Sequence, residues 1–135
     1  MGDIIENFGL NAGKVWNVLN KQGPLNQYNL LRTTKLKKND LCTAVGWLAR
    51  EDKICLKNNF YCLGETNFAD TIGEDAGKIF DLLNTYDEID LNFIQKITGI
   101  SPDNTYYALG WLAREGKIKA KKVLPKTPQL YLKLK

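Results

Sequence analysis

Two features of the 135-residue sequence predict a mainly α fold with small β-hairpins (α+β class) that is built twice in succession. The first is an ungapped internal repeat at an offset of 64 residues, which aligns residues 12–20 with 76–84 and residues 44–54 with 108–118. The second is the order of patterns within each copy, in which three amphipathic helical segments precede an alternating hairpin pattern. A repeat of this kind indicates a duplication.

The repeat therefore predicts two small domains, residues 1–64 (copy one) and residues 65–135 (copy two). Residues that favour helix N-caps precede the first two helices of each copy: Asn11 and Asn26 in copy one, Asp75 and Asp90 in copy two. We expect the first helix to end near residue 21 or 85, before a turn that leads to a short second helix.

A tight turn is expected between the second and third helices. In copy two Gly99 can adopt a positive φ, Ser101 can cap the third helix and Pro102 suits its first position. Gly116 can end that helix in a left-handed conformation. The equivalent helix of copy one is expected over about 38–51.

An alternating β pattern follows each third helix. Residues 53–63 predict a hairpin that turns at Asn58-Asn59, because Asn tolerates the positive φ of a two-residue turn. Residues 117–134 predict a longer hairpin around a proline-containing loop at 125–129. Three helices, a tight turn before the third and a terminal hairpin are typical of a winged helix-turn-helix, so we expect two such domains in tandem.

Two motifs also resemble a known family. They are Ala-Gly-Lys-(Val/Ile)-(Trp/Phe) in the first helix and Gly-Trp-Leu-Ala-Arg-Glu-(Gly/Asp)-Lys-Ile from the third helix into the hairpin. Both copies are similar to a small winged helix-turn-helix family of bacteria and archaea that has no assigned biochemical activity. The resemblance implies a winged-helix fold and an association with DNA binding. Copy one departs from the pattern at Asp52, where the motif has Gly, and at Lys35, where copy two has Gly99.

The composition argues against an enzyme, a metal site and a membrane protein. Histidine is absent, which excludes most hydrolase triads and zinc sites, and the three cysteines form no C-x-x-C pair. No Gly-rich phosphate loop is present, and no apolar run approaches the roughly 18 residues of a membrane helix. We therefore expect a cytoplasmic, non-enzymatic protein without a cofactor.

Cys55 and Cys62 lie opposite each other if Asn58-Asn59 makes the turn. A disulfide between them is conceivable. A hydrogen-bonded pair of a hairpin has the wider Cα separation, however, which suits a bridge less well, and a cytosolic setting favours reduced thiols. Reduced cysteines are the expected state.

The net charge of +4 divides unevenly along the chain. Residues 1–64 carry nine basic and five acidic side chains, residues 65–116 carry three and ten, and residues 117–135 carry seven lysines and no acid. Basic surfaces attract the phosphates of DNA. We therefore hypothesise a transcription-related regulator that binds double-stranded DNA through the helix-turn-helix corner, the third helix of copy one and the last wing: Arg32, Lys35, Lys37, Lys38, Asn39, Thr43, Arg50, Lys119, Lys121, Lys122 and Lys126.

Helical projection places a Gly, a Trp and an Arg on the outward face of each third helix. Glycine in a helix interior costs roughly 1 kcal/mol relative to Ala, so its recurrence indicates that something approaches the backbone closely. One interpretation is packing against the wing or the other domain. The competing functional hypothesis is a protein-interaction face that docks a partner or makes a homodimer, formed by Gly46, Trp47, Tyr106, Tyr107, Gly110, Trp111 and Arg114.

Overall fold

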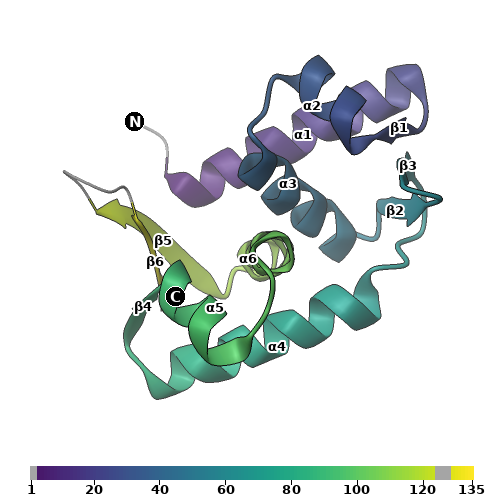
Figure 1. Cartoon of the computed structure of the whole chain (residues 1–135). Helices are drawn as coiled ribbons and strands as arrows, with labels where there is room; N and C mark the ends of the chain where they lie inside the picture. Colours follow the sequence, from purple (N-terminus) through teal and green to yellow (C-terminus); the bar gives the residue numbers. More distant parts are fainter. Residues whose placement is uncertain (1–2, 124–128) are drawn as a thin grey trace.

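The computed structural model describes residues 3–123 and 129–135, and it confirms the predicted α+β class (Figure 1). Each copy has three helices followed by a hairpin. Copy one contains α1 (Ile4–Gln22), β1 (Leu25–Asn26), α2 (Gln27–Thr34), α3 (Lys38–Arg50), β2 (Ile54–Lys57) and β3 (Phe60–Leu63). Copy two repeats this order with α4 (Ala69–Thr85), β4 (Glu88–Asp90), α5 (Leu91–Thr98), α6 (Pro102–Arg114), β5 (Ile118–Val123) and β6 (Gln129–Leu134).

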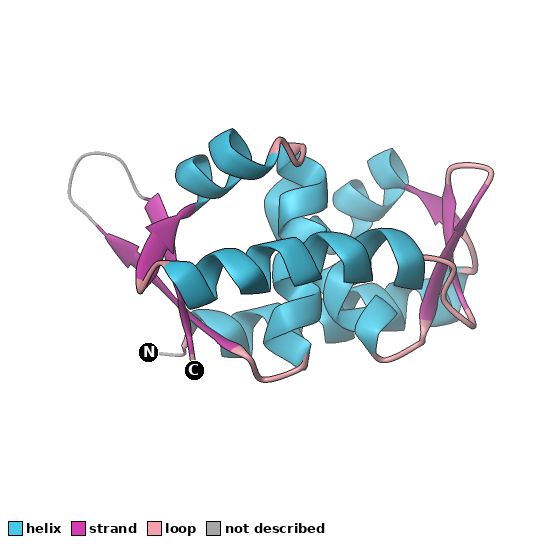
Figure 2. Ribbon diagram, turned by 90° about the horizontal axis from the view of Figure 1, so that it is seen from below, coloured by secondary structure: helices cyan, strands magenta, loops and turns pink. Residues whose placement is uncertain are grey.

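Each hairpin is extended by a third strand that the sequence did not predict. The segments before the second helices were expected to be turns, but β1 pairs with β3 and β4 pairs with β6, both antiparallel. The sheet orders are β1-β3-β2 and β4-β6-β5. Strands of two or three residues are too short to show an alternating pattern in the sequence. The two sheets lie at opposite ends of the molecule, with the helices between them (Figure 2).

Both first helices begin earlier than the N-cap pattern predicted. α1 begins at Ile4, capped by Asp3, and not after Asn11. α4 begins at Ala69 and not after Asp75. The physical reason is an apolar stripe that continues upstream in both helices at spacings of four, three and four residues: Phe8, Ala12, Val15 and Leu19 in α1, and Ile72, Ala76, Ile79 and Leu83 in α4.

The predicted caps of the second helices are present. Asn26 accepts a hydrogen bond from the backbone N–H of Asn29 at 2.9 Å, and Asp90 accepts one from that of Phe93 at 2.7 Å. Ser101 caps α6 by accepting from the N–H of Asn104, as predicted.

The turn before the third helix has the same backbone conformation in both copies. Gly99 has φ 72°, as expected for a left-handed C-cap, and Lys35 at the same place in copy one has φ 64°. After the third helix, Gly116 has φ 71° and Asp52 has φ 61°. The two departures from the family motif therefore leave the turns unchanged. A side chain in this conformation costs roughly 1–2 kcal/mol.

The first hairpin turns at Asn58 and Asn59, with φ 52° and 67°, as predicted. Cys55 pairs with Cys62 in register, and the structure joins the two as a disulfide. The expectation of reduced thiols is therefore wrong for this structure. The Cα atoms of this directly opposed pair are 5.2 Å apart, which is within the range that a disulfide spans. The predicted loop of the second hairpin falls largely on residues 124–128, which lie outside the described residues.

Each copy has its own hydrophobic core, and each first helix also contributes a residue to the core of the opposite copy. Phe8 of α1 is buried in the core of copy two, and Ile72 of α4 is buried in the core of copy one. The early helix starts thus place one turn of each first helix against the opposite copy. The copies consequently form one packed body.

The left-handed turn at Lys35 provides a test of the fold. We expect Lys35→Gly to raise the free energy of unfolding by about 0.5–1 kcal/mol, because Gly adopts this conformation without the steric cost of a side chain. Urea denaturation followed by circular dichroism measures the change. As a control, Lys14→Gly on the exposed side of α1 should lower the free energy of unfolding by about 1 kcal/mol. Equal losses in the two variants would contradict the left-handed turn.

Candidate functional site

The third helices of the two copies, α3 and α6, cross with their backbones in contact. A Cβ atom on Gly46 would overlap the carbonyl oxygen of Tyr107 and lie 2.7 Å from its carbonyl carbon. A Cβ atom on Gly110 would overlap the carbonyl oxygen of Thr43 and lie 2.8 Å from the backbone nitrogen of Trp47. Real Cβ atoms do not approach other atoms so closely. The glycine at the same place in both copies is thus required by the crossing.

The two tryptophans flank this crossing. Trp47 packs against both hydrophobic cores, and so does Trp111. A Cβ atom on Gly9 of α1 would lie 3.0 Å from the Trp47 ring, and one on Gly73 of α4 would lie 3.5 Å from the Trp111 ring. The structure therefore shows packing between the copies, one of the interpretations that the sequence left open.

Reciprocal ion pairs join the C-terminal ends of the two crossing helices. Arg50 donates from Nε to Glu115 Oε2 at 3.0 Å, and Arg114 donates from Nε to Glu51 Oε2 at 2.9 Å. Each guanidinium also lies over a tryptophan ring of the opposite copy, Arg50 over Trp111 and Arg114 over Trp47, at 5.7 and 5.9 Å from the ring centre. The symmetric arrangement shows that the duplicated residues act as the two halves of one interface.

The N-terminal ends of the same helices are also joined, by an ion pair. Lys38 Nζ lies 3.2 Å from Asp103 Oδ2. Nearby, the hydroxyls of Tyr61 and Tyr107 share a hydrogen bond of 2.6 Å across the two copies. Burial raises the pKa of the Cys42 thiol to about 12 and also raises the pKa of Tyr107. These groups therefore remain protonated at neutral pH, which suits packing rather than nucleophilic chemistry.

The predicted outward face of α3 is buried over its middle. Thr43 is 2% exposed and donates its hydroxyl to the carbonyl oxygen of Asp40 at 2.9 Å, and Gly46 is buried as well. The expectation that these two residues face solvent is wrong, because α6 of copy two covers them. Arg50 is partly exposed, but its guanidinium is held by Glu115 and Trp111.

The residues predicted as a docking face lie at or beside the same contact. Gly46, Trp47, Tyr107, Gly110, Trp111 and Arg114 all contact the opposite copy, while Tyr106 is half-buried in α6 beside a neighbouring pocket. The structure therefore uses this face within the chain. A partner could reach most of it only after the copies separate.

The helix-turn-helix corner of copy one remains exposed. Arg32 lies in the last turn of α2, Lys35 and Lys37 lie in the turn, and Lys38 and Asn39 begin α3. Lys37 occupies the N-cap of α3 and makes no side-chain cap hydrogen bond, in contrast to Ser101 at the same place in copy two. Uncapped backbone N–H groups at a helix start favour an anion. The corner thus combines four basic side chains and one acidic one, Asp40 in the first turn of α3, with a helix start that has no side-chain cap.

The last wing lies beside this corner. A pocket of about 290 Å³ is lined by Lys37 and Asn39 of copy one together with Tyr106 of α6 and Leu130 of β6. On the wing, Lys119 and Lys121 are exposed, and Lys121 Nζ lies 3.2 Å from Glu88 Oε1. The side chain of Lys122 and the whole of Lys126 lie outside the described residues. Of the wing residues, only Leu130 lines this pocket, while Lys119 and Lys121 line a different one, so the two basic surfaces are separate.

Comparison with protein families matches one model twice. The winged helix-turn-helix domain family (DUF2582) matches residues 3–62 and residues 68–132. Comparison with curated proteins and with solved structures finds no match. In the described residues no helix is long and apolar enough to cross a membrane, and no three potential metal ligands gather at one place.

The close crossing predicts a large effect of very small substitutions. We expect Gly46→Ala or Gly110→Ala to lower the free energy of unfolding by about 3 kcal/mol, because the added methyl group forces two helix backbones apart. Urea denaturation followed by tryptophan fluorescence measures this loss.

Two other helical glycines serve as matched controls. Gly13 and Gly77 have open space around the position of a Cβ atom, so Gly13→Ala and Gly77→Ala should stabilise the protein by about 0.5–1 kcal/mol. A similar response of all four variants would show that the helices do not touch at Gly46 and Gly110.

Proposed function

Because the chain belongs to the winged helix-turn-helix domain family (DUF2582), we propose that it is a non-enzymatic protein that binds double-stranded DNA in a transcription-related role. Winged helix-turn-helix domains are in general DNA-binding modules. The observation that carries the proposal is the exposed basic corner between α2 and α3, formed by Arg32, Lys35, Lys37 and Lys38.

Phosphates of a DNA backbone match the chemistry of this corner. Basic side chains and the uncapped start of α3 favour an anion. Within residues 3–123 and 129–135, Arg32, Lys35 and Lys37 form no ion pair. Lys38 alone shares its charge with Asp103. Arg32 also lies 5.6 Å over the ring of Tyr28, an exposed aromatic side chain on the same helix.

The buried crossing restricts how such a protein reads bases. In a free winged helix the third helix lies along the major groove, but here the middle of α3 is covered by α6. Only the first turn, with Lys38 and Asn39, is left for base edges. Thr43 and Arg50 do not form part of the proposed contact. We therefore expect affinity dominated by phosphates, with weak sequence preference.

The last wing extends the proposed surface. Lys119 and Lys121 are exposed on β5, and we include Lys122 and Lys126, which come later in the sequence. Only Leu130 of the wing lines the pocket beside the corner, so the wing lysines would be met by a duplex that extends beyond the corner. The wing lysines then add contacts to the backbone without reading sequence.

Charge reversal at the corner tests this function. We expect the triple variant Arg32→Glu/Lys35→Glu/Lys37→Glu to weaken binding of a fluorescent 20-base-pair duplex by at least about 30-fold at 50 mM salt, because three phosphate contacts are lost. The slope of log affinity against log salt concentration should fall by about two to three units. Fluorescence anisotropy over a salt series measures both quantities.

The duplication supplies a matched control for this experiment. Lys96 on α5 occupies the place of Arg32 in copy two and is equally exposed, but it lies in the acidic part of the chain. Lys96→Glu should leave DNA affinity within about twofold, whereas Arg32→Glu should weaken it by several-fold. Absence of binding by the unaltered chain at 50 mM salt, or equal effects of the two single variants, would overturn the proposal.

A further inference from the structure

The two sheets differ at the outer edges of β2 and β5, where backbone groups have no neighbouring strand. The sheet orders place β2 and β5 at the edges. Gly64 donates its N–H to the carbonyl oxygen of Lys53, and Lys135 donates to that of Lys117, each at 3.0 Å. These equivalent bonds show which residues of β2 and β5 point their backbone groups toward the neighbouring strand and which point them away. The residues that turn their N–H and C=O groups away from the neighbouring strand are therefore Ile54 and Leu56 in β2, and Ile118, Ala120 and Lys122 in β5.

The edge of copy one is closed by a side chain. Asn67, in the joint between the copies, accepts from the N–H of Leu56 at 3.0 Å through Oδ1. Its Nδ2 group donates to the carbonyl oxygen of the same residue at 2.7 Å. The carboxamide thus makes both hydrogen bonds that a neighbouring strand would make. This edge presents no free site at Leu56.

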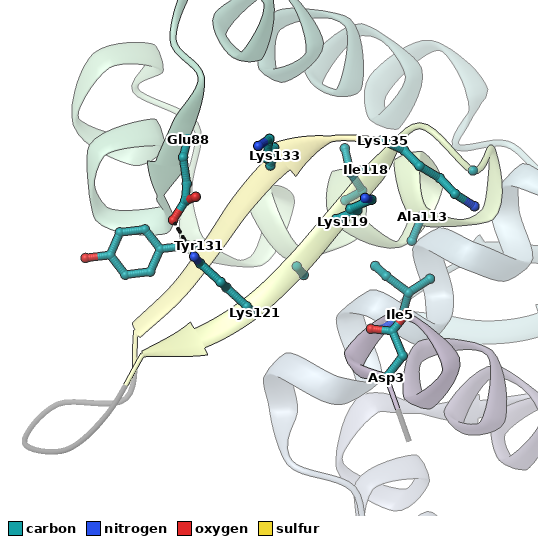
Figure 3. A pocket seen from close by; sticks show the side chains of 12 residues that line it. Asp3, Ile5, Glu88, Ala113, Ile118, Lys119, Lys121, Tyr131, Lys133 and Lys135 are labelled. Carbon is teal, nitrogen blue, oxygen red and sulfur yellow. Dashed lines mark hydrogen bonds and ion pairs between the residues drawn. The ribbon is translucent and has the colours of Figure 1, made fainter. Parts of the chain in front are cut away.

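The equivalent edge of copy two is open. Ala120 takes the place of Leu56, and no group in the described part of the chain bonds to its outward N–H or C=O. A groove of about 480 Å³ runs along this edge, between β5 and the start of α1 (Figure 3). Ile5 of α1 is partly exposed in its lining, while Ala113 and Ile118 form its buried floor.

The rim of the groove is basic. Lys119 and Lys133 are direct partners in the ladder, so two like charges face each other, and Lys135 lies on the same rim. The groove contains two carboxylates, from Asp3 and Glu88, and Glu88 already pairs with Lys121. The unpaired lysines therefore favour a ligand that carries negative charge.

We infer that the outer edge of β5 binds an extended acidic segment of a partner protein as an additional antiparallel or parallel strand. Ala120 offers one donor and one acceptor, and a peptide backbone satisfies both. The phosphodiester backbone of DNA accepts hydrogen bonds but does not donate them, so it can bond to the N–H of Ala120 and not to its carbonyl oxygen. A second copy of this chain would bring Lys119 and Lys121 of both molecules together across the new pair, which like charges disfavour.

A designed peptide tests the inference with the full chain. The probe is a fluorescein-labelled peptide of eight residues in which Glu and Val alternate, so that acidic side chains lie on one face of the strand. We expect it to bind in an anisotropy titration at least tenfold more tightly than the same peptide with Lys in place of Glu. An absence of binding, or equal binding of the two peptides, overturns the inference.

Backbone methylation distinguishes strand addition from charge attraction alone. One peptide carries N-methyl groups on all Glu residues and the other carries them on all Val residues. Alternate N–H groups of a strand point to opposite sides, so one of the two peptides should lose binding by at least tenfold while the other retains it. Equal affinities of the two methylated peptides would overturn the inference.

Substitutions in the protein complete the test. Ala120→Pro removes only the outward N–H, because this residue does not donate to β6. It should abolish peptide binding while the circular dichroism spectrum and the affinity for duplex DNA stay unchanged. If Ala120→Pro fails to fold, Lys119→Glu/Lys133→Glu decides, with an expected loss of at least tenfold for the peptide. Conversely, Arg32→Glu weakens DNA and leaves the peptide unaffected, so either proposal can fail without the other. Unchanged peptide binding in both edge variants overturns the inference.

Discussion

The rest of the structure depends on the missing side chains of Gly46 and Gly110. Because neither residue has a Cβ atom, α3 and α6 approach until their backbones touch, and this distance sets where every other side chain of the interface lies. Trp47 and Trp111 fill the space beside the crossing, and reciprocal arginine and glutamate pairs join the C-terminal ends of the two helices. The charged pairs are partly exposed and contribute little by themselves, so the burial of apolar surface stabilises the contact.

The same contact explains which parts of the structure could be predicted from the sequence. Caps, turns and hairpins depend on residues close together in the chain, so Asn26, Asp90 and Ser101 could be assigned from local patterns alone. The repeated glycines indicated a close approach, but helical projection does not show what covers a face. The burial of Thr43 and the early start of α1 arise from packing against the opposite copy, which no local pattern contains.

Duplication has left the two copies alike in the interface and different at the surface. The glycine, tryptophan, arginine and glutamate of the crossing are the same in both, since each half needs the other to fit. Outside it, Lys37 stands where copy two has the capping Ser101, and among the described residues no side chain closes the edge of β5 as Asn67 closes that of β2. Surface positions outside the cores can change without disturbing the packing. The basic turn before α3 and the open edge of β5 both lie at such positions.

A consequence follows for how this arrangement can bind DNA. In a single winged helix the third helix is both the centre of the domain and its reading surface, whereas here α3 and α6 use those surfaces on each other. The groups left for recognition lie at the rim: the start of α3, the basic turn before it and the outer strand of copy two. A rim of this kind contacts phosphates and backbone groups more readily than base edges, because side chains at the ends of elements do not enter a groove as a helix does. The fold thus favours binding by charge and shape over the reading of a base sequence.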